Sequence, residues 1–154
     1  MDRPVGRDRQ FEDVYEAEYA RQVRRAGLLV GDGDAAHDIV QDSFAGLLSR
    51  WAEVANPGGY LNRSVLNGCR DHARRRLRRE RFAHSEPTPA DGPPEADPLW
   101  DVLVRLPFNQ RAVIVLRYYG DLTEAEIAEA LDCPTGSVGP WLRRALDRLR
   151  EELT

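Results

Sequence analysis

The 154-residue chain contains no lysine, only two cysteines and no long apolar run. Two cysteines far apart argue against a disulfide framework, so we expect a cytoplasmic protein. No apolar stretch approaches the ~20 residues that cross a bilayer, so we expect no membrane contact. No apolar segment follows the first arginines, which argues against a secretory signal. The length allows one ordinary domain or two small ones.

Charge is distributed unevenly, although the whole chain carries a net charge of only −4. Residues 60–81 contain eight arginines against two acidic residues, whereas the remaining segments are net acidic. The planar guanidinium suits phosphate because it donates two hydrogen bonds at once. The helix dipole favours arginines near the C-terminal end of a helix, so a solvated helix end would account for some of these residues. It would not account for all eight. The basic segment is therefore a candidate nucleic-acid surface.

Apolar residues recur at helical spacing in two tracts, and no part of the chain shows a comparable strand pattern. The first tract covers residues 11–82, after a flexible N-terminal segment at residues 1–10. The second covers residues 99–154. Between them, residues 83–98 are acidic and rich in proline, which predicts a linker without a packed core. We therefore predict an all-α protein of two small helical domains.

Local signals place the helix boundaries of the first tract. Asp32 or Asp34 is suited to cap the second helix. The sequence Asn56-Pro57-Gly58-Gly59 predicts a turn, and we expect the third helix to start near Tyr60.

The second tract has the pattern of a helix–turn–helix. Thr123 and Glu126 have the spacing of a capping box, and Ala128 is small where two helices pack closely. Asp132 is expected in the left-handed turn position, and Val138 is the apolar anchor of the next helix. A plain helical hairpin is the alternative, although the pattern favours DNA binding.

The sequence offers no convincing catalytic or metal-binding constellation. The histidines at 37, 72 and 84 do not have metal-ligand spacing, and no phosphate-binding glycine loop is present. We therefore expect no enzyme activity, no cofactor and no metal.

Together these segments resemble the extracytoplasmic-function group of bacterial RNA polymerase sigma factors. The resemblance rests on GDGDAAHDIVQDSFAGLLSRW, PGGYLNRSVLNGCRDHARRR and LVRLPFNQRAVIVLRYYGDLTEAEIAEALDC, in that order, followed by GSV and RALDRLR. It covers the chain except its first ten residues and the linker. It implies a first domain for polymerase binding, minus-ten recognition and melting, and a second for minus-thirty-five recognition. A sigma subunit of this kind directs transcription initiation.

The resemblance also implies roles for individual residues. Asp38, Gln41 and Asp42 match positions that dock on the clamp coiled coil of polymerase, and the flap is a second contact. The minus-ten positions lie in the predicted turn and on the helix after it. A base flipped from the duplex needs a pocket, which suits a glycine-containing loop beside an aromatic ring. Packing in the core is an equal alternative for Tyr60. The minus-ten positions are Asn56, Gly58, Tyr60, Asn62, Arg63, Asn67, Arg70 and Arg74.

The minus-thirty-five region departs from the family pattern at Gly139-Pro140, where a basic residue and serine are usual. Proline is tolerated only in the first turn of a helix, so we expect Ser137 to be the N-cap of a helix that starts late. The departure is compatible with a shifted set of reading residues or with weakened reading. The candidates are Thr135, Ser137, Trp141, Arg143 and Arg144.

Two alternatives belong to other functional classes. A helix–turn–helix regulator would bind duplex DNA without polymerase. A degenerate sigma factor would bind polymerase without initiating transcription, and the Gly139-Pro140 departure motivates this reading. An anti-sigma factor is a further possible partner. The sequence identifies neither the promoter nor the inducing signal.

Overall fold

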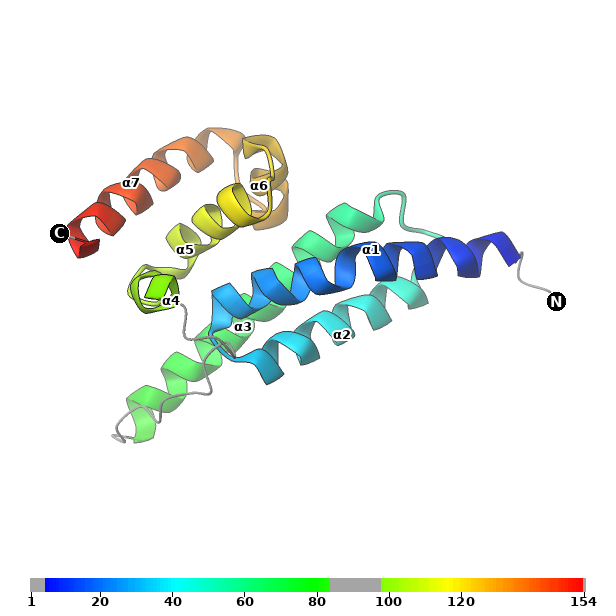
Figure 1. Cartoon of the computed structure of the whole chain (residues 1–154), viewed down its shortest axis with the longest axis horizontal. Helices are drawn as coiled ribbons and strands as arrows, with labels where there is room; N and C mark the ends of the chain where they lie inside the picture. The colour runs from blue at the N-terminus through cyan, green and yellow to red at the C-terminus, as the bar shows by residue number, and fades with distance from the viewer. Residues whose placement is uncertain (1–4, 84–97, 154) are drawn as a thin grey trace.

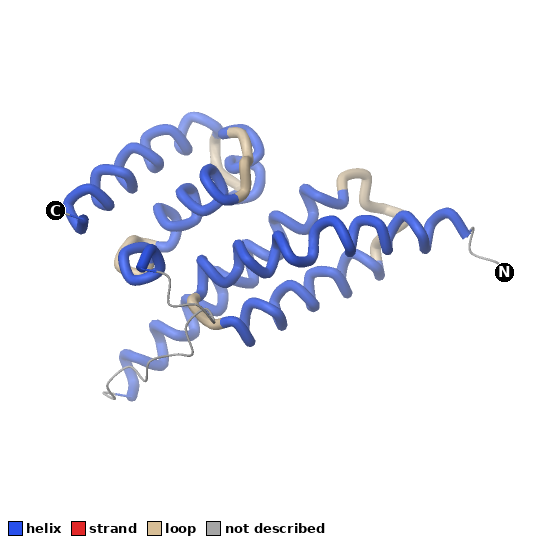
Figure 2. Tube along the Cα trace, viewed as in Figure 1, coloured by secondary structure: helices blue, strands red, loops and turns tan. Residues whose placement is uncertain are grey.

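The computed structural model describes residues 5–83 and 98–153, and these residues form helices joined by short turns (Figures 1 and 2). No strand occurs within the described ranges, so the all-α prediction is confirmed. The predicted linker lies outside them except for its end residues, which belong to the flanking helices. None of the described helices is long and apolar enough to cross a membrane.

The first domain is a bundle of three helices: α1 (Val5–Val30), α2 (Gly33–Ser49) and α3 (Pro57–Ala83). The side chain of Asp32 accepts a hydrogen bond from the Ala35 amide, which confirms the predicted cap of α2. Helix α1 begins earlier than the sequence predicts. Residues 5–10 continue this helix because they include no proline and several good helix formers. The buried core of the bundle consists mainly of Val40, Phe44, Leu47, Leu61, Val65, Leu66 and Cys69.

The start of α3 corrects the prediction of a turn through Gly59. The helix begins at Pro57, so Gly58 and Gly59 lie in its first turn. The carboxamide oxygen of Asn56 accepts a hydrogen bond from the Gly59 amide at 3.1 Å, which satisfies a donor that the helix leaves unpaired. Proline fits the first helical position because its fixed φ is already helical and no amide is needed there.

The second domain contains α4 (Pro98–Leu103), α5 (Phe108–Ile114), a π-helix η1 (Val115–Tyr119), α6 (Glu124–Leu131) and α7 (Thr135–Leu153). The capping box between Thr123 and Glu126 is present at the start of α6. Asp132 adopts the predicted left-handed conformation with φ 54°, and Val138 is fully buried. These three local predictions are therefore confirmed.

The start of α7 differs from the prediction. Ser137 is not the N-cap, because the helix begins at Thr135 and the Ser137 amide already donates to the Pro134 carbonyl. Pro140 lies inside the helix, where its missing N–H leaves the Gly136 carbonyl without a helical partner. Gly136 is exposed, so water can solvate that carbonyl and the early helix start is tolerated.

Arg111 of α5 is a buried cation that joins the two domains. Its guanidinium donates to the carbonyls of Leu103, Val104 and Leu106 in its own domain, at 3.0 to 3.4 Å. It also donates to the Leu29 carbonyl in the last turn of α1 at 2.6 Å. Burial lowers the pKa of Arg111 to about 10. Carbonyl oxygens at the ends of α4 and α1 oppose this effect, because they stabilise the charged form.

We predict that Arg111→Met lowers the free energy of unfolding by about 3 kcal/mol, because buried carbonyls lose a charged donor. Urea denaturation followed by circular dichroism measures this change. Arg105→Met is the control, since Arg105 is exposed and makes a surface ion pair with Glu152. The control should change stability by less than about 1 kcal/mol. Equal losses in the two variants would contradict the role given to Arg111.

Candidate polymerase and nucleic-acid surfaces

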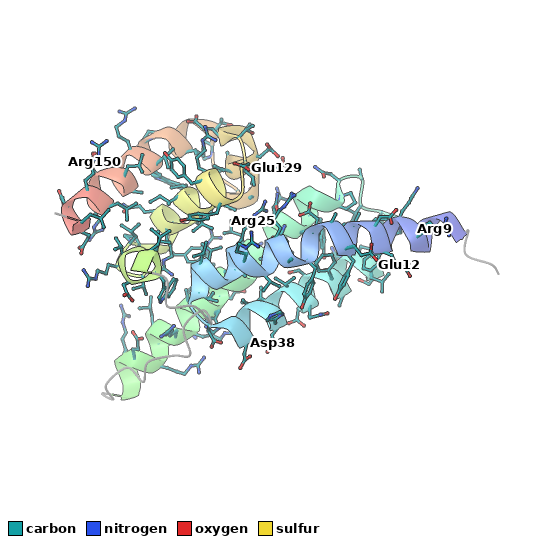
Figure 3. All side chains as sticks on the ribbon, in the orientation of Figure 1. Arg9, Glu12, Arg25, Asp38, Glu129 and Arg150 are labelled. Atoms are coloured by element: carbon teal, nitrogen blue, oxygen red, sulfur yellow. The ribbon has the colours of Figure 1, made fainter. Side chains whose placement is uncertain are left out.

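The polar face of α2 carries the three residues implied in polymerase binding. Asp38, Gln41 and Asp42 are exposed, and Figure 3 shows Asp38 pointing away from the bundle. The Gln41 amide donates to the hydroxyls of Tyr15 and Tyr19 on α1, at 3.2 and 3.1 Å. Helix α1 thus fixes the orientation of Gln41, while the two carboxylates remain open to a partner.

Asn62 is held in a polar network beneath the start of α3. Its carboxamide oxygen accepts hydrogen bonds from Gln22 and from Arg25, both at 2.8 Å. Gln22 and Arg25 are buried, and burial lowers the pKa of Arg25 below its ordinary value. Sequence reasoning missed both residues, because a glutamine and an arginine in a helix usually lie on its solvated face. The network fixes the orientation of Asn62.

Tyr60 packs in the bundle. It is half-buried against the core, and its hydroxyl lies so close to Gly46 that a Cβ there would approach it to 2.6 Å. Of the two roles considered for this residue, the structure shows the packing contact.

Arg63, Asn67, Arg70 and Arg74 lie on one side of α3, because spacings of four and three residues return to the same helical face. Arg63 donates to the Glu129 carbonyl at 3.2 Å. Arg70 donates to the side chains of Asn67 and Asn109, both at 3.4 Å, and lies over the Phe108 ring. Arg74 is exposed.

The same spacing continues to Arg78 and Arg81, which are also exposed. Both belong to the basic segment 60–81 that the sequence marks as a candidate nucleic-acid surface, although neither is among the minus-ten positions. We call the six residues from Arg63 to Arg81 at this spacing the α3 stripe. Figure 1 shows that the C-terminal part of α3 extends beyond the other two helices of the bundle.

A polar cavity of about 320 Å³ lies between the start of α3 and the second domain. The first domain contributes Asn56, Gly58, Gly59 and Asn62 together with the arginines of α1. The second domain contributes acidic side chains from α6 and the turn before it. Three of the residues implied in minus-ten binding, Asn56, Gly58 and Asn62, therefore line a cavity shared with the second domain. The charged lining residues are Glu18, Arg21, Arg25, Asp121, Glu126 and Glu129.

The minus-thirty-five candidates lie on the first half of α7. Thr135, Arg143 and Arg144 are exposed, and Ser137 is partly buried. Trp141 packs against the hydrophobic core. The N-terminal part of the helix offers few long side chains, and Arg143 and Arg144 are the basic residues of its first half.

Comparison with known proteins identifies the family. Residues 7–79 match sigma-70 region 2, and residues 96–149 match sigma-70 region 4. The chain is 34% identical to the RNA polymerase sigma-E factor of Streptomyces coelicolor, over 97% of this chain and 89% of that protein. The chain belongs to the sigma-70 family. The ECF RNA polymerase sigma factor RpoE of Cereibacter sphaeroides is 42% identical over 34% of this chain and 29% of that protein.

The fold of the sigma factor resembles that of the sigma factor RpoE solved in complex with the anti-sigma factor NepR from Bartonella quintana. The TM-score is 0.76 at 20% identity, covering 94% of this chain and 96% of that one. By its sequence matches, the sigma factor belongs to the extracytoplasmic-function group, whose members bind core RNA polymerase and direct initiation at promoter DNA. Sigma factors are non-catalytic initiation factors.

Two asparagines on α3 should differ in how much they contribute to stability. We predict that Asn62→Ala lowers the free energy of unfolding by about 2 kcal/mol, because Gln22 and Arg25 lose a buried acceptor. Asn67→Ala should leave stability unchanged, since Asn67 is exposed. Thermal unfolding of both variants measures the difference. A stability loss at Asn67 equal to that at Asn62 would contradict this assignment.

Proposed function

We propose that the sigma factor docks on the clamp coiled coil of core polymerase through the exposed carboxylates of α2, oriented with Gln41. The observation that supports this is the arrangement of Asp38, Gln41 and Asp42 on one open face, off the apolar side of the helix. Because these residues contribute little to the core, they are available for a partner. The second domain would contact the flap.

We further propose that α3 recognises and melts the minus-ten element. Its arginines donate to phosphates, and the polar groups around Asn56, Gly58 and Asn62 accommodate an unstacked base. No bond chemistry is required, because binding to the separated strand offsets the cost of unstacking. The subunit has no catalysis of its own and would act in the cytoplasm, where an anti-sigma factor is a possible partner.

The second domain is proposed to read the minus-thirty-five element through the start of α7. Arg143 and Arg144 are exposed one turn beyond the Gly139-Pro140 departure. Their reach to phosphate and base edges does not depend on the missing basic residue at position 139. This arrangement favours a shifted set of reading residues over loss of reading.

We predict that Asp38→Ala/Asp42→Ala lowers run-off transcription at least about tenfold, equivalent to ~1.4 kcal/mol of lost docking energy. The assay uses purified core polymerase and a pool of upstream fragments from a GC-rich host. Glu12→Ala/Glu16→Ala is the matched control, because it removes two exposed carboxylates at the same spacing from α1. The control should retain wild-type activity.

Discrete start sites from the wild type, lost in the Asp38/Asp42 variant, would support the proposal. Polymerase binding without any start site would instead favour the degenerate sigma reading. Retention of a duplex fragment by the protein alone, without polymerase binding, would favour the helix–turn–helix regulator.

We predict that Arg143→Ala/Arg144→Ala lowers transcription about tenfold from promoters with an intact upstream element, because contacts to DNA are lost. The loss should shrink when the upstream element is scrambled, which separates DNA reading from a folding defect. Arg148→Ala, one turn further along α7, serves as the control. An equal loss on both promoter types would contradict a reading role.

A further inference from the structure

Asn62 lies where three polar side chains of the first domain meet. Its carboxamide oxygen accepts hydrogen bonds from Gln22 and from Arg25, both at 2.8 Å. Gln22 is only 1% exposed and Arg25 only 4%. The three residues belong to α1 and α3, so the network lies within the first domain.

Arg25 determines which end of the Asn62 carboxamide faces inward. A guanidinium carries donors and no acceptor, so it can bond only to the oxygen of the carboxamide. If the carboxamide turned over, its NH₂ group would meet the guanidinium and a buried donor of Arg25 would be left unpaired, which is costly. Gln22 adds a second bond but does not determine the orientation, because its own carboxamide can present a donor or an acceptor.

The amide nitrogen of Asn62 is consequently the group that remains available for a ligand. Asn62 lines the polar cavity of about 320 Å³ at the start of α3. No residue that the structure describes accepts a hydrogen bond from this nitrogen. Asn62 therefore offers the cavity a hydrogen-bond donor and no acceptor.

Other polar groups on the first-domain side of the cavity are donors as well. The side-chain oxygen of Asn56 is occupied by the Gly59 amide, which leaves its NH₂ group as the available end. The Nε of Arg25 is buried and has no hydrogen-bond partner among the described residues. Glu18 also lines the cavity, and its carboxylate is paired with Arg21 at 3.4 Å. This side of the cavity therefore fits a ligand edge made of acceptors.

Nucleobases fall into two classes according to what they present to such a donor. Guanine carries a keto oxygen at O6 and thymine at O4, whereas adenine and cytosine carry an amino group at the equivalent position. A donor that faces this position bonds to a keto oxygen. On an amino base it meets another donor, and both groups lose their hydrogen bonds.

We propose that Asn62 is a specificity-determining residue that donates to the keto oxygen of one unstacked minus-ten base, and so selects guanine or thymine. Arg25 is its positioning residue, because it fixes the end of the carboxamide that faces the base. The inference rests on the proposed function, which places an unstacked base beside Asn62.

Asn62→Asp tests the polarity of this contact. A carboxylate still accepts from Gln22 and Arg25, but it offers the base an acceptor in place of a donor. Run-off transcription with core polymerase is measured on a promoter from the fragment pool, with each minus-ten position varied through the four bases. At one position the wild type should favour guanine and thymine, and Asn62→Asp should shift the ratio toward adenine and cytosine by about fivefold or more.

Asn67→Asp is the matched control for the added negative charge. It makes the same chemical change on the same helix, at an exposed residue that does not line the cavity. It should not alter the base preference at the position that Asn62→Asp changes.

Two further substitutions separate positioning from packing. Arg25→Met removes the guanidinium and lets the Asn62 carboxamide turn over, so the base preference at that position should fall to near unity. Gln22→Met also removes a buried donor to Asn62 but keeps Arg25, so the preference should persist. Circular dichroism establishes which variants are folded. If Arg25→Met does not fold, Asn62→Asp alone decides the proposal.

Two results in transcription would overturn the proposal. One is an unchanged base preference at every minus-ten position in Asn62→Asp. The other is an equal change of preference in folded Arg25→Met and Gln22→Met. Transcription decides the proposal wherever the wild type initiates.

Binding by the protein alone separates this inference from the proposed function. Fluorescence anisotropy at low salt compares labelled single strands that contain only thymine or only cytosine. The wild type should bind the thymine strand more tightly, and Asn62→Asp should reverse or abolish this difference. If the wild type does not initiate but shows this behaviour, the proposed function fails and the Asn62 contact stands. If it neither initiates nor distinguishes the two strands, both fail.

Discussion

A buried guanidinium must be surrounded by acceptors, and Arg111 meets this requirement by collecting carbonyls from both halves of the molecule. Leu103 and Leu106 supply acceptors where α4 ends, and Leu29 supplies one where α1 ends. An isolated charge in this position would be costly, so the end of α1 and the turn after α4 must stay where the guanidinium can reach them. The placement of the second domain on the first follows from this constraint.

Arginine side chains also donate to backbone carbonyls at other helix ends. Arg76 donates to the Val30 carbonyl at the end of α1, Arg63 to the Glu129 carbonyl near the end of α6, and Arg25 to the Gly120 carbonyl after η1. Carbonyls at the last turn have no intrahelical donor and carry the negative end of the helix dipole. Arginine suits them because its fork offers several donors in fixed geometry, whereas a lysine-free chain has no other long permanent cation. Part of the arginine content is thus structural.

The distance along the chain between contacting residues explains which features the sequence could predict. The Asp32 cap, the Thr123 capping box and the left-handed Asp132 depend on neighbours within a few residues, and local pattern predicts them. Arg25 and Arg111 depend on partners far along the chain, at Gly120 and Leu29, and nothing in local periodicity reveals such contacts. The early starts of α3 and α7 were missed for a related reason. Proline predicts a helix boundary at both sites, although Pro57 fits the first helical position and Pro140 leaves only an exposed carbonyl unpaired.

The arginines of the α3 stripe have two competing sets of acceptors. In the structure Arg63 and Arg70 bond to a carbonyl and a carboxamide of the second domain. In the proposed minus-ten complex they would bond to phosphates. Phosphate binding weakens steeply with salt, because binding releases counterions from the nucleic acid and added salt opposes that release. Hydrogen bonds to neutral acceptors depend on salt far less. The proposed docking of α2 on polymerase uses a different face of the bundle, so it does not involve the α3 stripe.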